Sequence, residues 1–314
     1  MQIRIVHRIS LILMCLCPVF MQAQDVPISQ WLNNVMYQSP SWAGFTGKLR
    51  ANAFYRNQWP MSNAELSYGG FFVDAPLTSK VGCSVGVVDE KNSLYNNIDI
   101  STAGSYLLAI TRSVHISFGI KLGLSQTSLS VGELEFENPE TVGQSTSPLR
   151  FDSGLGTSVV FNNWYAVLVA DHLNRPYIGI SEIESNRVNA KLTFGLSRIF
   201  YCETGFRKPQ VSIIPNIFYQ QQGIQQNLQL GIITQYRVIE IGFWGRKGFN
   251  NGQTNAIIGL GYNGLHSRLM YSYDANLCKK IKGNGGAHEL SLTWLFDIEK
   301  EKKKKMIECP SFLH

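Results

Sequence analysis

Charged residues, long apolar runs and paired cysteine motifs are all scarce in this chain of 314 residues. Asp, Glu, Lys and Arg make up 16% of the sequence, below the roughly 25% that is typical of soluble domains. After the N-terminal region no stretch reaches about 18 uninterrupted apolar residues, so membrane-spanning helices are not expected. The six cysteines form no CxxC pair and no metal-ligand spacing. A disulfide framework, a metal site and a cofactor are therefore not expected.

The first 23 residues have the layout of a cleaved secretory signal peptide. Two arginines precede the apolar run 9–20, and Ala23 offers a cleavage position. A lipoprotein signal is the rival because Cys15 and Cys17 lie in the run, but each follows a large residue, and we favour ordinary cleavage. Removing the two arginines would lower the formal charge from +6 to +4. That charge is too mild to indicate nucleic-acid binding.

What the chain does contain, repeatedly, is alternation of apolar and polar residues. In Lys48 to Pro60, KLRANAFYRNQWP, an extended strand would place Tyr55 and Trp59 on an apolar face and Arg56 and Gln58 on a polar face. About 11 residues suffice for a tilted strand to cross a bilayer, and Trp59 would lie in an aromatic girdle. An exported chain without spanning helices can cross a membrane only as a closed barrel.

We therefore predict an all-β fold, a transmembrane outer-membrane β-barrel of about 14 antiparallel strands. A signal peptide (1–23) and an irregular N-terminal segment (24–47) would precede the barrel (48–296), and a periplasmic C-terminal tail (297–314) would follow it. The strands are expected near 48–59, 64–73, 80–89, 97–111, 113–124, 150–160, 164–172, 188–200, 211–220, 225–236, 238–246, 254–263, 266–274 and 287–296.

Connection lengths indicate the direction of the strands, because outer-membrane barrels have short periplasmic turns and longer outer loops. If the first strand runs outward, the outer connections include 125–149, 173–187 and 275–286, the longest in the chain. The tail, with five lysines among four acids, is then periplasmic. We favour a solvated tether over an anionic-surface contact for this tail.

Two features of the expected lumen have more than one interpretation. Trp164 to Ala170 is apolar on both faces. Either it contacts a plug, a partner or a filled lumen, or its tyrosine and valines are ordinary lumen fillers, which is the interpretation we favour. Arg50 and Arg56 share the polar face of the first strand, as either a charged constriction for a solute or part of structural ion pairs. We favour ion pairs, with candidate partners Glu240, Glu289 and Asp152.

Enzymatic chemistry finds no support in the sequence. A barrel enzyme would need a nucleophile with a base, or paired carboxylates, gathered at one rim. The histidines are scattered over different predicted strands. Asp171 and His172 are adjacent, so in a continuous strand they would point to opposite faces and could not form a dyad. We expect a protein that is not an enzyme.

Several ordered motifs resemble the PorP/SprF family of type IX secretion system outer-membrane proteins. YRNQW at 55–59 is the most specific, and SPSWAG at 39–44 resembles the family's NPAYAG-type opening, with Ser39 and Trp42 in place of the usual Asn and Tyr. VDAPL (73–77), a glycine-rich strand ending at 89, DSGLG (152–156), DHLNRP (171–176), LMYSYD (269–274), HELSL (288–292) and CPSF (309–312) follow in the family order.

The resemblance implies a barrel in a Bacteroidota-like cell that serves protein secretion and often gliding motility. It implies periplasmic secretion-motor and peptidoglycan-linked partners, a secreted adhesin or its C-terminal domain as cargo, and outer-membrane lipid around the wall. The rival is a solute channel or porin. A Cys202–Cys309 disulfide tethering the tail is conceivable in an oxidising periplasm. The motif positions carried over as structural or interaction sites are Pro40, Ala43, Gly44, Tyr55, Arg56, Asn57, Gln58, Trp59, Asp74, Pro76, Asp152, His288, Glu289, Cys309, Pro310 and Phe312.

Overall fold

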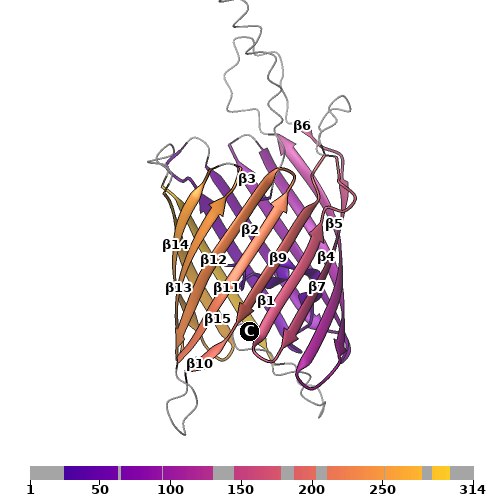
Figure 1. The fold of residues 1–314 in the computed structure, drawn as a ribbon. Helices are drawn as coiled ribbons and strands as arrows, with labels where there is room; N and C mark the ends of the chain where they lie inside the picture. Colours follow the sequence, from indigo (N-terminus) through magenta and orange to yellow (C-terminus); the bar gives the residue numbers. More distant parts are fainter. Residues whose placement is uncertain are drawn as a thin grey trace, which may run out of the picture.

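The strands of the computed structural model form a closed antiparallel barrel (Figure 1). The structure describes residues 25–62, 65–93, 95–129, 145–177, 187–202, 211–250, 252–277 and 285–297. The sheet has sixteen strands, of which β6 lies off the ring and β9 and β10, separated only by Ile199, both pair with β11. Fourteen wall strands remain, and the pairings of β1 with β16 and of β9 with β11 close the ring. The predicted barrel of about 14 strands is confirmed.

The elements alternate apolar and polar side chains in the way the sequence indicated, and most boundaries lie within a few residues of the predicted ones. In chain order they are α2 Val35–Gln38, η1 Pro40–Trp42, β1 Leu49–Gln58, β2 Leu66–Pro76, β3 Val81–Asn92, β4 Tyr95–Ala109, β5 Val114–Leu129, β6 Ser145–Thr146, β7 Arg150–Phe161, β8 Trp164–Asp171, β9 Lys191–Arg198, β10 Phe200–Cys202, β11 Val211–Gln222, β12 Gln225–Tyr236, β13 Ile239–Gly248, β14 Thr254–Asn263, β15 Ser267–Asn276 and β16 Ala287–Phe296.

The helices in the described part of the chain are short, and none of them is long and apolar enough to cross a membrane. The longest connections between wall strands, 130–149, 172–190 and 277–286, all join strand ends at the same end of the barrel, the end near β6 at the top of Figure 1. We call this the outer end and the opposite one the periplasmic end, following the rule for outer-membrane barrels.

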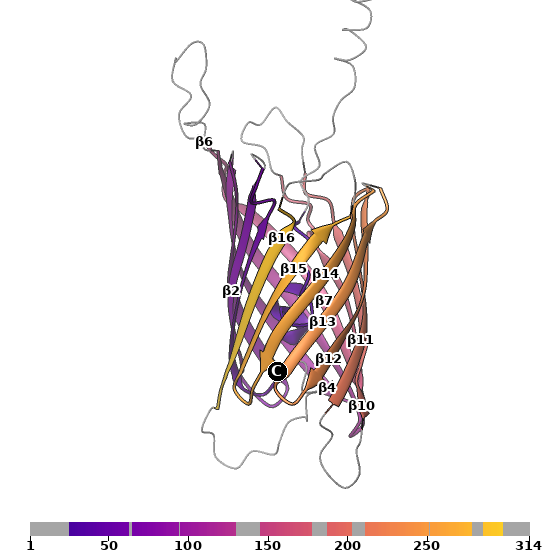
Figure 2. The same cartoon turned by 90° about the vertical axis from the view of Figure 1, so that its left-hand side faces the viewer.

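Residues 25–47, called the luminal segment from here on, lie inside the barrel (Figures 1 and 2). Near the outer end, the backbone N–H of Asp25 donates to the side chain of Gln222 at 2.8 Å. At the periplasmic end the segment leads into Leu49, which pairs with Phe296. The sequence had indicated only an irregular stretch before the first strand, so its path through the lumen is a finding of the structure.

Two tryptophans fix the luminal segment against one side of the wall. Trp31 stacks on Phe218, with ring centroids 5.0 Å apart, and on Tyr165 at 6.0 Å. Trp42 packs edge-on against Tyr165 at 5.0 Å and donates its indole N–H to the Tyr165 hydroxyl. Both indoles are almost completely buried. The apolar inner face of β8 thus contacts a plug formed by the luminal segment, and the ordinary lumen filling that we favoured from the sequence was wrong.

Glycines on the inner wall make room for the backbone of this segment. A Cβ on Gly119 would lie 2.3 Å from the carbonyl carbon of Pro40. Gly44 has a φ of +65°, and a Cβ there would lie 2.6 Å from the carbonyl oxygen of Ala75. These positions allow close approach of two backbones, which a side chain would prevent.

We expect Gly119→Val to destabilise the barrel, because the new methyl groups would overlap Pro40 and force the luminal segment away from β5. Overpacking of this kind costs about 1–3 kcal/mol. Gly104→Val is the matched control, since that glycine faces outward and a Cβ there meets nothing within 4 Å. The urea midpoint of refolded barrels, followed by heat-modifiable migration in gels, measures the effect. Equal midpoints for both variants would contradict the close packing.

Candidate functional site

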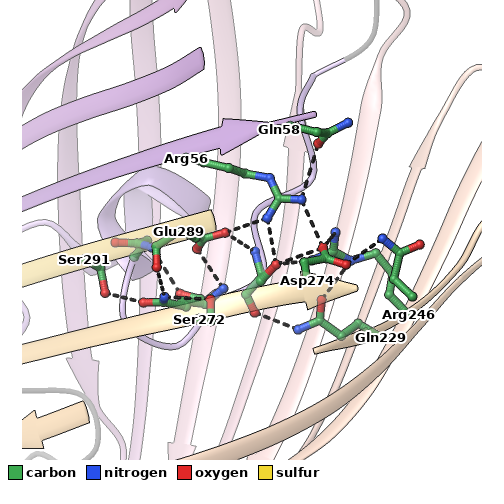
Figure 3. A network of polar contacts seen from close by, with 12 residues as sticks. Arg56, Gln58, Gln229, Arg246, Ser272, Asp274, Glu289 and Ser291 are labelled. Atoms are coloured by element: carbon green, nitrogen blue, oxygen red, sulfur yellow. Dashed lines mark hydrogen bonds and ion pairs between the residues drawn. The ribbon is translucent and has the colours of Figure 1, made fainter. Parts of the chain in front are cut away.

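A buried polar cluster in the lumen is built around Ser29 of the luminal segment (Figure 3). The Ser29 hydroxyl accepts hydrogen bonds from Arg56 at 2.9 Å and Arg246 at 2.7 Å. Its backbone N–H donates to Glu289 at 2.7 Å, and its carbonyl accepts from Gln229 at 2.7 Å. Ser29 of the luminal segment is thereby hydrogen-bonded to side chains from β1, β12, β13 and β16.

The charges in this cluster compensate one another within the wall. Arg56 lies 3.0 Å from Asp274 and 3.0 Å from Glu289, and Arg246 lies 3.0 Å from Asp274. Glu289 also accepts the backbone N–H of Gln30 at 2.9 Å. The exposed fraction is 2% for Arg56 and 1% for each carboxylate. These buried charges are paired and hydrogen-bonded, which a lone buried ion would not be, although the Nε of Arg56 has no hydrogen-bond partner among the described residues. We call Ser29, Gln30, Arg56, Gln229, Arg246, Asp274 and Glu289 the Ser29 network.

A second cluster holds the beginning of the luminal segment near the outer end. Asp25 pairs with Lys191 at 2.5 Å and with His172 at 3.2 Å. His172 also lies 3.0 Å from Asp152, while Lys121 and Lys191 pair with Asp171 at 2.6 and 3.4 Å.

Asp171 and His172 do not diverge as a continuous strand would require. β8 ends at Asp171, and His172 has a φ of +56°. This left-handed conformation turns the imidazole towards Asp25 and Asp152, so the expectation of opposite faces was wrong. His172 remains engaged in ion pairs with carboxylates.

The ion pairs of the first strand are structural, as favoured from the sequence, but only one of the proposed partners is right. Glu289 does pair with Arg56. Arg50 instead pairs with Asp74 at 2.9 Å and Glu240 with Arg268 at 2.9 Å. Position in the ring separates these pairs: Asp74 lies on β2 beside β1, whereas Glu240 on β13 is remote from Arg50 and pairs with Arg268 on β15, across β14.

Motifs that are far apart in the sequence meet at the luminal segment. Pro40 lies against the inner faces of β5 and β7, where a Cβ on Gly156 of the DSGLG motif would be 2.9 Å from its ring. Asp74 of the VDAPL motif accepts the backbone N–H of Gly44 at 2.6 Å. Ala43 accepts a hydrogen bond from Ser105 at 2.5 Å. Pro76 ends β2 opposite Gly82, a strand-end position that proline tolerates.

Other motif residues face away from the lumen. Tyr55 is 51% exposed on the outer wall. Asn57 donates to Glu65 at 2.7 Å, and the His288 ring lies 2.7 Å from the Tyr271 hydroxyl. Trp59 was expected on this lipid-facing side, and that expectation was wrong. β1 ends at Gln58, and a φ of +60° at Trp59 redirects its side chain to a cavity at the outer end.

The C-terminal motif lies outside the described residues. Cys309, Pro310 and Phe312 belong there, as do the signal peptide 1–23 and the pairing of Cys202 with Cys309. Of the tail only Asp297 is described, where it pairs with Lys48 at 2.7 Å and His266 at 3.0 Å. Hydrogen bonds from these two side chains hold the pKa of Asp297 below its usual range.

The residues that sequence reasoning missed are those of the luminal segment, above all Asp25, Ser29 and Trp31, and their partners Arg246 and Asp274. Arg246 and Asp274 lie on inward positions of alternating strands, so the strand pattern could have identified them. The segment itself gives no periodic signal. Within the described residues, no group of three or more His, Cys, Asp or Glu side chains could hold a metal ion.

We expect Arg56→Met to lower the free energy of unfolding by about 3–5 kcal/mol, because it leaves Asp274 and Glu289 buried with fewer partners. Asn57→Ala is the control, since this neighbour in the same motif faces outward. Urea unfolding of the refolded barrels measures both. If the two variants unfold at the same urea concentration, the Ser29 network does not stabilise the fold.

The His172 cluster predicts a dependence of stability on pH. Burial alone would lower the pKa of His172, but the charge of Asp25 and hydrogen bonds to Asp152 and Asp25 outweigh it and raise the pKa to about 9. The unfolded value is about 6.5, so this contribution is complete below that pH and is lost as the pH rises through about 9. Unfolding free energy should fall by on the order of 2–3 kcal/mol. His172→Gln should remove this fall, and parallel pH profiles for both proteins would contradict the assignment.

Comparison with known proteins places this barrel in a family. The model of the family "Type IX secretion system membrane protein PorP/SprF" matches residues 20–294. A search of curated proteins finds no match.

Solved structures share the fold at low sequence identity. The monoaromatic hydrocarbon channel CymD has a TM-score of 0.52 at 11% identity, with 85% of this chain and 94% of CymD covered. The toluene transporter TodX of P. putida has a TM-score of 0.47 at 10% identity, covering 86% and 94% of the two chains. Omp33 of Acinetobacter baumannii has 0.46 at 8%, covering 81% and 100%. The family match spans most of the chain, and the chain belongs to the PorP/SprF family of type IX secretion system outer-membrane proteins.

Proposed function

We propose that this protein serves the type IX secretion system as a closed docking barrel that binds partner proteins and does not conduct solutes. In this role it supports protein secretion and, with it, gliding motility or the export of a surface adhesin. As part of the same proposal, the protein has no enzymatic activity of its own. The observation that carries it is the luminal segment, which lies in the barrel interior and is bonded to the wall from Asp25 to Gly44.

The bonding of this segment favours a rigid support over a gate. Its anchors are distributed from Asp25 near the outer end to Gly44, which donates to Asp74 near the periplasmic end. Between them lie the Ser29 network and the two buried tryptophans. Moving such a segment would break buried ion pairs and expose large aromatic rings, both of which are costly.

Partners have two ends of the barrel available. Periplasmic secretion-motor and peptidoglycan-linked proteins would bind the short turns and the tail, and a secreted adhesin or its C-terminal domain would bind the outer end. Both assignments follow from family membership, and the rigid barrel supports them by holding its turns at fixed spacing. Affinity purification from crosslinked, detergent-solubilised membranes tests them, and recovery of no secretion-system component would contradict them.

We expect the wild-type barrel to show no steady conductance in planar bilayers, because the luminal segment occupies the pore. A variant lacking residues 25–47 should conduct wherever heat-modifiable migration shows that its barrel has formed. Trp31→Ala with Trp42→Ala is a milder variant that keeps the chain length, and it should conduct intermittently. Steady conductance of the wild-type protein would favour a solute channel instead.

Deletion of the gene distinguishes a docking barrel from a solute channel in cells. A docking barrel predicts that secretion of adhesin or other type IX cargo is lost while uptake of small solutes continues at the wild-type rate. Loss of solute uptake with intact secretion would reverse the conclusion.

A further inference from the structure

A cavity of about 250 Å³ lies at the outer end of the lumen, above the Ser29 network. Asp25, Val26 and Pro27 of the luminal segment form part of its lining, together with side chains near the outer ends of several wall strands. It is slightly smaller than the roughly 300–1,000 Å³ of typical small-molecule sites. A sugar unit or two could enter it, whereas a folded protein domain could not.

Side-chain amides are the most frequent polar groups in the lining. Each amide has two N–H donors and a carbonyl acceptor without net charge. Several already bond within the barrel, as Gln222 does to Asp25 and Asn255 does to Asp274, so a ligand would use their remaining donor and acceptor positions. On adjacent strands β11 and β12, Gln220 and Asn227 are direct neighbours and both face inward. The side-chain carbonyl of Gln58 accepts a hydrogen bond from Arg56 at 3.3 Å, and the amino group of the same amide points away from the Ser29 network (Figure 3). The lining amides are Gln58, Gln220, Gln222, Gln225, Asn227, Gln253, Asn255 and Asn276.

The charged residues of the lining are already compensated by their neighbours. Arg56 and Arg246 pair with Asp274, and Lys191 pairs with Asp25. A charged ligand would have to compete with buried carboxylates or ammonium groups, which is unfavourable. Trp59, with Leu66, adds an apolar surface beside the amides. Amides that both donate and accept, next to an indole, suit a ligand rich in hydroxyl groups with apolar C–H faces.

We propose that this cavity binds the end of a neutral oligosaccharide. An extended peptide is the competing ligand class, but peptides commonly bind barrels and sheets by adding a strand to an unpaired edge. Every wall strand that contributes to this cavity is paired on both sides in the closed ring. The cavity therefore offers side-chain amides and lacks the backbone edge that peptide binding would use.

The test uses the purified full-length barrel in detergent on an array of neutral glycans, acidic glycans and unstructured peptides, followed by titration of the strongest neutral glycan. Gln220→Ala with Asn227→Ala removes two inward amides. The matched control is Gln221→Ala with Gln226→Ala, the next cross-strand pair on the same hairpin, which does not line the cavity.

We expect a neutral glycan to bind the wild-type and control proteins and to bind the inward variant at least about tenfold more weakly, the factor that corresponds to about 1.4 kcal/mol. Heat-modifiable migration confirms that each barrel is folded. The proposal is overturned if no neutral glycan binds, if only acidic glycans or peptides bind, or if the inward variant binds as tightly as the control.

Discussion

Two buried carboxylates, Glu289 and Asp274, impose the constraint on which the rest of this barrel depends. Each is about 1% exposed in the interior of a membrane protein, where an ion without partners is severely unfavourable. Arg56 and Arg246 supply the opposite charge, and Ser29 supplies the hydrogen bonds that complete the set. Because Ser29 and Gln30 belong to the luminal segment, Glu289 has its two backbone N–H donors only when that segment is in place.

This dependence links the stability of the barrel wall to the placement of the luminal segment inside it. Tryptophans 31 and 42 pack on aromatic residues of β8 and β11, and inner-wall glycines permit the close approach of the segment. The residues of the luminal segment that contact the wall thus also lie in the lumen. Such an arrangement holds the two ends of the barrel in a fixed relation, which the proposed docking role would require.

The family motifs acquire a common physical meaning in this arrangement. SPSWAG, VDAPL and DSGLG come from distant parts of the chain, yet SPSWAG lies in the luminal segment itself, and Asp74 of VDAPL and Gly156 of DSGLG both contact it. YRNQW contributes to both sides of the wall, since Arg56 enters the Ser29 network while Tyr55 and Asn57 face outward. The motifs therefore describe how the plug and the wall fit together. At the outer end of the luminal segment lies the cavity whose lining is rich in side-chain amides.

The sequence by itself determined the barrel, because a strand with one lipid-facing side must alternate, and that period-two pattern is local. It also placed Glu289 among three candidate partners of Arg50 and Arg56, and Glu289 pairs with Arg56. The sequence could not predict the path of residues 25–47, because a segment inside a lumen contacts many strands at once and shows no periodic pattern of apolar residues. The pairing of Arg50 with Asp74 was decided by strand adjacency, and the directions of His172 and Trp59 by positive φ angles at strand ends. These depend on the closed tertiary structure, since only there do the wall and the luminal segment meet.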